Sequence, residues 1–246
     1  MRDTATWGRD LEALHASDWP SFVNAHSGLP GPRANLPLVQ AAASSADAEV
    51  IDALMKDGGE YAAMCAAAAA GRRADESRFL ERARALAADE RWRVREGVVI
   101  GLQLLGDADP QMLARIVRAW VEDPDPLVQR AAVAAICEPR LLRTPEAAAT
   151  AIAACGRATQ QLAALPREQS RRPDARTLRQ TLGYAWSVAV AADPLPGLEA
   201  FGDLDVTVTD VDWIVRQNRR KKRLAALLEG GGAVGEEGLE PPTFRV

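Results

Sequence analysis

The chain has few of the residues that build metal sites or disulfides. Histidine occurs only at His15 and His26, and the three cysteines, Cys65, Cys137 and Cys155, are far apart in the sequence. We interpret the cysteines as small buried hydrophobes, because they lie in alanine-rich segments and lack the close spacing of a ligand set. We therefore expect no metal site and no disulfide.

Long apolar runs are also missing from the sequence. No stretch reaches the roughly 18 apolar residues of a membrane-spanning helix. The N-terminal residues MRDTATWGRDLEAL lack the apolar core of a signal peptide. The sequence thus predicts a soluble, cytoplasmic protein that does not associate with membranes.

Aromatic residues make up only 5% of the chain, and β-branched residues rarely follow one another. Both residue types favour β-strands, whereas the abundant alanine has the highest helix propensity. We therefore expect an all-α fold. A length of 246 residues suits one domain or a short repeat array.

The usual signatures of enzyme sites are not found either. The sequence has no Gly-rich phosphate loop, no Cys-Xaa-Xaa-Cys pair and no Ser-His-Asp set at a supporting spacing. Carboxylates that lie close together, such as Asp107 with Asp109 or Glu122 with Asp123, fall in predicted turns, where we interpret them as helix caps. We predict no cofactor and no catalytic residue, and the sequence favours a non-enzymatic function.

Proline marks the predicted helix starts. In four dipeptides a capping oxygen precedes a proline at the first helical position: Asp109-Pro110, Asp125-Pro126, Thr144-Pro145 and Asp193-Pro194. Apolar residues follow at helical spacing, and the segment from Val94 to Leu105 is apolar nearly all round. Such a helix suits a position between two neighbours in a stack of helix pairs.

A weak repeat supports stacked pairs. The block Trp92–Gly97 can be aligned with Pro126–Ala131, 34 residues later, and with Trp213–Asn218, 87 residues after that. Spacings of about 34 to 50 residues are typical of helix-pair repeats, in which each unit must stack to bury its apolar face. We predict a HEAT-like α-solenoid of stacked antiparallel helix pairs.

This solenoid is expected to form a single domain over residues 1–229. Residues 1–37, with a loop at Gly28–Pro32, are expected to cap its N-terminal end. Residues 230–246 are predicted to be a disordered tail that begins at Gly230. The ending GLEPPTFRV is similar to the peptide made when a reading frame runs past its stop through a tRNA gene, which makes the tail a candidate read-through artefact.

Three segments resemble bacterial HEAT-repeat proteins related to the AlkD-like DNA alkylation repair superfamily. They are Gln129–Leu142 (QRAAVAAICEPRLL), Leu182–Ala189 (LGYAWSVA) and Asp212–Leu224 (DWIVRQNRRKKRL). The likeness covers roughly Tyr61 to Leu228, and it implies an armadillo-like helical fold and a link to DNA.

The resemblance does not extend to the catalytic residues of the AlkD-type glycosylases. Those enzymes carry a Gly-Trp pair followed by an Arg-Glu pair in a late helix, together with a catalytic aspartate. Here Gly183 is followed by Tyr184, and Ser187-Val188 replaces the charged pair. We therefore carry over no catalytic residue.

The most distinctive charged feature is a basic run near the C-terminal end. On one continuous helix, Arg216, Arg219, Arg220 and Arg223 would share a narrow arc beside an apolar arc of Trp213, Ile214, Leu224 and Leu228. Such a ridge is suited to binding phosphates. Alternatively, its cations stabilise the C-terminal half of the helix through the helix dipole.

A second basic stretch lies between Pro166 and Pro173, which we expect to be an exposed loop carrying Arg167, Arg171 and Arg172. Because the whole chain has a net charge of −4, any contact with nucleic acid must be local to such a patch. The tryptophans Trp92, Trp120, Trp186 and Trp213 could serve as base-stacking platforms, but at helical spacing they are better interpreted as core.

Two functions remain after these exclusions. In the first, the chain is a non-catalytic HEAT-repeat scaffold that presents a concave surface to a protein partner. In the alternative, it is an AlkD-like DNA-binding protein or a DNA glycosylase acting in alkylation repair. In both, the candidate contact residues are those of the two basic stretches: Arg167, Arg171, Arg172, Arg216, Arg219, Arg220 and Arg223.

Overall fold

A computed structural model describes residues 2–31 and 33–229 of the chain. In these residues the protein is all-helical and has no β-strand, as the sequence predicts. Its α-helices are α1 (Thr4–Glu12), α2 (Trp19–Ala25), α3 (Leu36–Ser45), α4 (Ala48–Asp57), α5 (Glu60–Arg72), α6 (Ser77–Ala87), α7 (Trp92–Ala108), α8 (Pro110–Trp120), α9 (Pro126–Ile136), α10 (Pro145–Ala163), α11 (Arg167–Ser170), α12 (Pro173–Ala192), α13 (Pro194–Gly202), α14 (Thr209–Arg219) and α15 (Lys222–Glu229). Two short 3-10 helices are η1 (Ala16–Asp18) and η2 (Pro139–Leu141). The predicted tail at residues 230–246 and Pro32 of the predicted loop lie outside the described residues.

All four predicted helix starts are confirmed, because α8, α9, α10 and α13 begin at the expected prolines. Asp109, Asp125 and Thr144 each accept a hydrogen bond from a backbone N–H in the first turn of the helix that follows. These caps satisfy donors that have no partner inside the helix. Asp193, in contrast, forms no such side-chain bond before α13.

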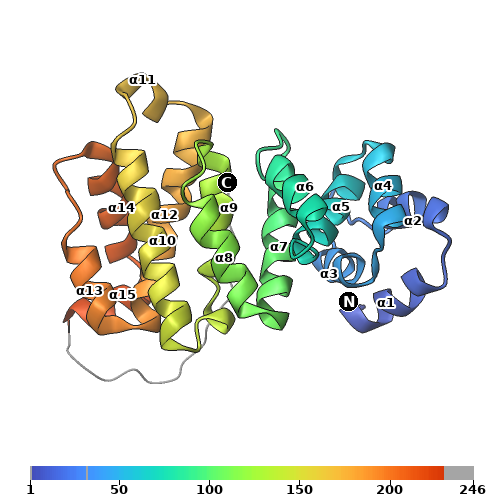
Figure 1. The fold of residues 1–246 in the computed structure, drawn as a ribbon, viewed down its shortest axis with the longest axis horizontal. Coiled ribbons are helices and arrows are strands. Elements are labelled where there is room, and N and C mark those ends of the chain that lie inside the picture. Colours follow the sequence, from blue (N-terminus) through green and yellow to red (C-terminus); the bar gives the residue numbers. More distant parts are fainter. Residues whose placement is uncertain (1, 32, 230–246) are drawn as a thin grey trace.

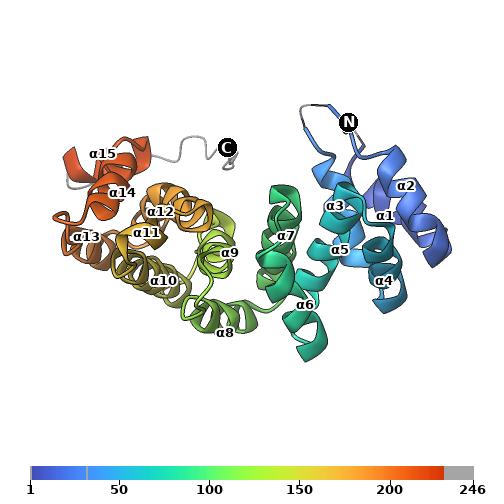
Figure 2. The same ribbon diagram turned by 90° about the horizontal axis from the view of Figure 1, so that it is seen from above.

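Alternate helices pack in one row: α1 on α3, α3 on α5, α5 on α7, α7 on α9, α9 on α12, and α12 on α14. Seen from above, the helices follow a curved path, with α7, α9 and α12 on its inner side and α6, α8 and α10 on its outer side (Figure 2). The core runs along the row and includes nearly the whole of α5, whose residues Tyr61–Gly71 are buried. The predicted cap boundary at residue 37 falls within the first turn of α3.

Helices α5 and α7 form the most extensive contact of the row, and small residues allow it. A Cβ atom built on Gly97 would meet the backbone carbonyl of Met64, and one on Gly101 would meet that of Ala68, both far inside van der Waals contact. Facing them, α5 contributes a run of alanines. Alanine and glycine at this junction therefore set the distance between the two helix axes.

Farther along the chain, Asn218 of α14 joins this helix to α12. Its buried side chain donates from Nδ2 to the carbonyls of Leu182 and Ile214, at 2.8 Å each, and accepts from the N–H of Ser187 at 2.9 Å. All three of these hydrogen bonds thus join the Asn218 amide to backbone groups, two in α12 and one in α14. Beside it, the ring of Trp213 packs against Gly183, where a Cβ would come within 2.7 Å of the ring.

The structure corrects two sequence-based expectations about local structure. The stretch from Pro166 to Pro173 is not only a loop, because it contains the short helix α11. The assignment of all four tryptophans to the core is right for Trp120 and Trp186, which are buried, but wrong for Trp92, which is 40% exposed at the first position of α7. Trp213 is half-buried. Among residues 2–31 and 33–229, none of the helices combines the length and apolarity that crossing a membrane requires.

Candidate partner-binding surface

The basic run near the C-terminal end is not one helical ridge, which corrects the sequence-based prediction. Helix α14 ends at Arg219, residues 220 and 221 form a turn, and α15 begins at Lys222. The arginines before and after this turn therefore do not share one helical arc. The predicted apolar arc is also incomplete, because Ile214 and Leu224 are buried whereas Leu228 is 48% exposed.

The side chains of this run have different partners. Arg216 forms an ion pair with Asp212, one turn earlier in α14, at 2.8 Å. The guanidinium of Arg223 donates to the Tyr184 hydroxyl at 2.7 Å and lies against the tyrosine ring. Arg219 and Arg220 are exposed at the end of α14. The arginines of the run thus comprise one ion pair within α14, one contact that attaches α15 to α12, and two exposed side chains at the end of α14.

A cavity of about 870 Å³ lies between the end of α10, α11, the first turns of α12 and the start of α14. Its lining is mostly polar and includes Arg167 and Arg171, two of the residues predicted from the sequence, together with Arg176 and Arg179. We call it the arginine cavity. Its single acidic lining residue is Asp210, so its walls carry four positive charges and one negative charge.

The arginines of this cavity differ in how they are held. Arg179 donates to Asp210 at 2.6 Å and lies over the ring of Trp213, 4.8 Å from its centroid. Arg167, Arg171 and Arg176 are exposed, and no carboxylate among the described residues forms an ion pair with them. The third predicted loop residue, Arg172, is instead paired with Asp174 at 3.4 Å.

Arg176 and Arg179 were missed in the sequence, although a signal was present. Arg172, Arg176 and Arg179 are spaced i, i+4 and i+7, which places arginines on one face of a helix. The helical pattern begins at Pro173, immediately after the expected loop, so most of this face lies outside the stretch whose charge indicated exposure. Two arginines of the cavity come from the predicted loop and two from the helix that follows.

The two groups of predicted contact residues lie at opposite ends of α14. Thr209 and Asp210 at its start line the arginine cavity, whereas Arg219 is its last residue. A helix of 11 residues is roughly 16 Å long. In Figure 1, α11 is at the top of the molecule and α15 near the bottom, with α14 between them. The two groups therefore do not converge on one site.

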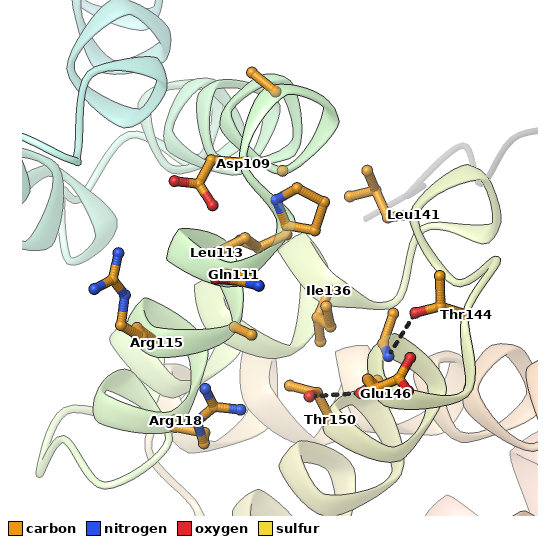
Figure 3. A pocket seen from close by; sticks show the side chains of 15 residues that line it. Asp109, Gln111, Leu113, Arg115, Arg118, Ile136, Leu141, Thr144, Glu146 and Thr150 are labelled. Carbon is orange, nitrogen blue, oxygen red and sulfur yellow. Dashed lines mark hydrogen bonds between the residues drawn. The ribbon is translucent and has the colours of Figure 1, made fainter.

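A second cavity, of about 700 Å³, lies between the end of α7, α8, the end of α9 and the start of α10. Figure 3 shows Leu113 and Ile136 among its side chains, with Arg115 and Arg118 on the α8 side and Glu146 on the α10 side. We call it the α8–α10 cavity. Two arginines are balanced here by Asp109 and Glu146, so its lining favours neither sign of charge.

No protein family, curated protein or solved structure matches this chain.

Ion pairs between helices use most of the carboxylates that we considered in the sequence. Glu122 accepts two hydrogen bonds from Arg157, at 2.6 and 2.7 Å, and Asp123 accepts two from Arg84, at 2.6 and 2.9 Å. The bonds from Arg157 lower the pKa of Glu122, so this carboxyl is ionised at neutral pH. Asp107 pairs with Arg140. The prediction that the acids are caps is confirmed for Asp109 and Asp125 and is wrong for Asp107 and Glu122. Asp123 accepts the backbone N–H of Asp125 in the turn before α9 in addition to its bonds from Arg84.

The start of α7 carries a denser network. Glu96 forms an ion pair with the buried Arg130 of α9, which occupies the aligned position of the repeat 34 residues later. Arg95 donates to the carbonyls of Asp89 and Glu90, and burial together with the charge of Arg130 lowers its pKa. The carboxyl of Asp89 accepts from Arg91, which lowers its pKa as well.

The three cysteines are buried, as predicted. Folding brings two of them together, because the Sγ atoms of Cys137 and Cys155 are 3.6 Å apart. Burial raises the pKa of Cys155 well above its usual value and thus favours the neutral thiol. Within the described part of the chain, no three His, Cys, Asp or Glu side chains are grouped as metal ligands would be.

Proposed function

We propose that the protein is a non-catalytic, HEAT-like solenoid of stacked antiparallel helix pairs that presents the inner side of its curve to a protein partner. The row of alternate helices from α1 to α14 supports this proposal, because each helix contacts the next member of the row. A solenoid built in this way has an extended concave surface, which repeat proteins commonly use for binding.

The observation that carries the proposal is a recurrent sequence separation between polar partners on different elements, which is 30 to 39 positions for the ion pairs that join distant elements. The pairs Asn24–Asp57, Glu60–Arg93, Glu96–Arg130, Asp107–Arg140 and Glu122–Arg157 join residues that are 33 to 35 positions apart. A recurrent separation is expected when one structural unit repeats, since equivalent helices then face each other in a similar register. The value is near the short end of the range for helix-pair repeats.

The ion pairs formed by the acidic side chains support a non-catalytic role. Asp123, Glu122 and Asp107 are held by arginines of neighbouring helices rather than directed into either cavity. At the positions where the AlkD-type motif departs, the backbone N–H of the buried Ser187 donates to Asn218, and the Tyr184 hydroxyl accepts from Arg223. These residues thus take part in contacts that attach α12 to α14 and α15.

The alternative, an AlkD-like DNA-binding protein, is favoured by the exposed arginines of the arginine cavity and by Arg219 and Arg220. Binding to duplex DNA would lose affinity with rising salt at a log–log slope of about 0.9 per phosphate contacted. If Arg219 and Arg220 contributed, replacing both with glutamate would flatten that slope by about 2. The separation of the two basic groups along α14 favours the protein-partner scaffold.

The test begins with identification of a partner by capture on the immobilised full-length chain. The partner is then purified, and its binding is measured by titration and by hydrogen exchange. We expect a saturable complex in which amides of successive inner helices, such as α7, α9 and α12, are protected. The same preparation is assayed with labelled duplex and single-stranded DNA over a range of salt, and with alkylated duplex.

Release of alkylated bases by the purified chain would refute the non-catalytic scaffold and favour the glycosylase alternative. Salt-sensitive DNA binding that Arg219→Glu/Arg220→Glu weakens would favour the DNA-binding alternative. A complex whose protected amides lie only on outer helices such as α8 and α10 would place the interface on the wrong side of the curve.

A further inference from the structure

Positive charge outweighs negative charge in the lining of the arginine cavity, although the chain as a whole is acidic. The arginine cavity has four arginines and one acid in its lining, whereas the whole chain has a net charge of −4. The one carboxylate present, Asp210, is already engaged by Arg179. Like charges gathered around one cavity repel each other, and an anion bound among them removes this cost.

We propose that the arginine cavity binds a phosphorylated segment of the protein partner, an inference that rests on the proposed scaffold function. Arginine clusters recognise phosphorylated peptides because the guanidinium forms paired, charge-assisted hydrogen bonds with phosphate oxygens. Arg167, Arg171 and Arg176 have no competing ion pair among the described residues. Ser170, Gln180 and Thr209 add neutral hydrogen-bonding groups to the lining.

Two features make Arg179 a positioning residue in this cavity. Its bond to Asp210 attaches the first turns of α12 to the start of α14, and its guanidinium rests on the Trp213 ring. These contacts hold the two walls of the cavity at a fixed separation. The other three arginines extend from α11, from the residue after it and from α12, where the incoming group can draw them together.

Charge and size favour a phosphate over a single carboxylate. A phosphorylated side chain carries about −1.5 to −2 charges and three acceptor oxygens, so it can engage more than one guanidinium at once. A carboxylate carries one charge, and a single bidentate arginine already engages both of its oxygens. The volume of about 870 Å³ is large enough for a phosphorylated side chain together with its neighbouring peptide.

The position of the remaining cations favours a peptide over a nucleic acid backbone. DNA presents a phosphate every few ångströms along its axis and is bound by rows of cations. Arg219 and Arg220 lie at the other end of α14 from the cavity. One compact basic cavity, rather than a basic track, matches a segment with one or two phosphorylated side chains.

The test is a fluorescence-anisotropy titration of the full-length chain with a labelled synthetic peptide that carries two phosphoserines. The same peptide without phosphate and a labelled oligodeoxythymidylate of equal charge are the comparison probes. We expect the phosphorylated peptide to bind about tenfold or more tightly than the unphosphorylated one, with an affinity that falls as salt rises.

Arg171→Glu/Arg176→Glu is expected to weaken binding of the phosphopeptide by about tenfold or more. Both side chains are exposed and form no ion pair with a described residue, so the fold is expected to persist. The matched control is Arg115→Glu/Arg118→Glu on α8, which changes the net charge equally at the α8–α10 cavity and should leave the affinity within about twofold. Thermal unfolding checks both variants, and Arg171→Gln/Arg176→Gln replaces the first if it unfolds.

The outcomes separate this inference from the proposed function. Equal binding of the two peptides, or equal losses in both double variants, overturns the phosphate site while leaving a scaffold complex intact. Tighter, Arg171- and Arg176-dependent binding of the oligonucleotide overturns the peptide in favour of nucleic acid. If phosphopeptide binding is confirmed but no protein partner is captured, the cavity stands and the scaffold fails.

Discussion

Glycine at two positions of α7 allows the closest helix contact in the protein. Gly97 and Gly101 are one turn apart and face backbone carbonyls of α5. Any side chain there must push the two helices apart, because backbone atoms cannot move aside as a flexible side chain can. Both glycines lie inside a segment that the sequence predicts to be helical, although glycine has a low helix propensity and destabilises a helix interior.

Replacing Gly101 with alanine is expected to lower the free energy of unfolding by about 1–3 kcal/mol, even though alanine is the better helix former. The added Cβ would meet the Ala68 carbonyl and come within 2.8 Å of the Arg72 nitrogen. Denaturant unfolding measures the change. Gly8→Ala in α1, which has open space around it, is the control and should raise stability by up to about 1 kcal/mol. A stabilised Gly101→Ala would show that α5 and α7 are not in close contact.

The arginines of this chain have several different structural roles, and the residues next to an arginine in the sequence do not indicate which role it has. Arg130 is buried in an ion pair with Glu96, Arg157 joins two helices on the surface, and Arg171 is exposed beside a cavity. Each partner lies more than 30 positions away or is absent from the described residues. Of the predicted contact residues, Arg167 and Arg171 share a cavity, whereas Arg172 and Arg216 are held by nearby aspartates.

At the scale of elements, the position at which α14 ends determines how the arginines of the basic run are arranged. A continuous helix was predicted because helical periodicity extends from Trp213 to Leu228. The chain turns at Arg220 and Lys221 instead, and Leu224 of α15 is then buried in the core. In a continuous helix, Arg219 would lie three and four positions from Lys222 and Arg223, and such like charges repel one another, which favours a break there.

Asn218 is expected to be the most sensitive polar residue of this region. Asn218→Ala should lower the free energy of unfolding by about 2–4 kcal/mol, because it leaves the Leu182 carbonyl and the Ser187 N–H without this buried partner. Chemical denaturation provides the measurement, with the neighbouring Gln217→Ala as control, for which a change within about 0.5 kcal/mol is expected. Equal effects of the two substitutions would contradict the bridging role of Asn218.

At the scale of the whole molecule, stability is expected to vary along the row of helices. The middle of the row contains α5, whose residues Tyr61–Gly71 are all buried, whereas α15 buries only Leu224. In an array where each unit contacts only its neighbours, the ends open more readily than the middle.

Hydrogen exchange of the full-length chain should therefore be slowest in α5 and α7 and fastest in α15, with intermediate protection in α12. Mass spectrometry of peptic peptides gives the rates for each helix. The Gly101→Ala variant provides the control, since it should accelerate exchange in α5 and α7 more than in α12. Uniform rates over all helices would instead indicate a single cooperative unit.

The sequence alone predicted the all-helical fold, the four proline helix starts and the burial of the three cysteines. These features depend on local propensity, on capping and on the apolar periodicity of single segments, which are all readable within about one helix length. The loop arginines Arg167 and Arg171 could be selected because charge in a proline-bounded stretch indicates exposure.

Only the tertiary structure decided which charges are paired among the described residues. It paired acids and arginines 30 to 39 residues apart, brought Arg176 and Arg179 to the same cavity as Arg167 and Arg171, and divided the basic run between two helices. Such contacts depend on the register of helices that are distant in sequence. The register cannot be predicted from one segment of the sequence alone, because it is set by close packing between helices at positions such as Gly97 and Gly101.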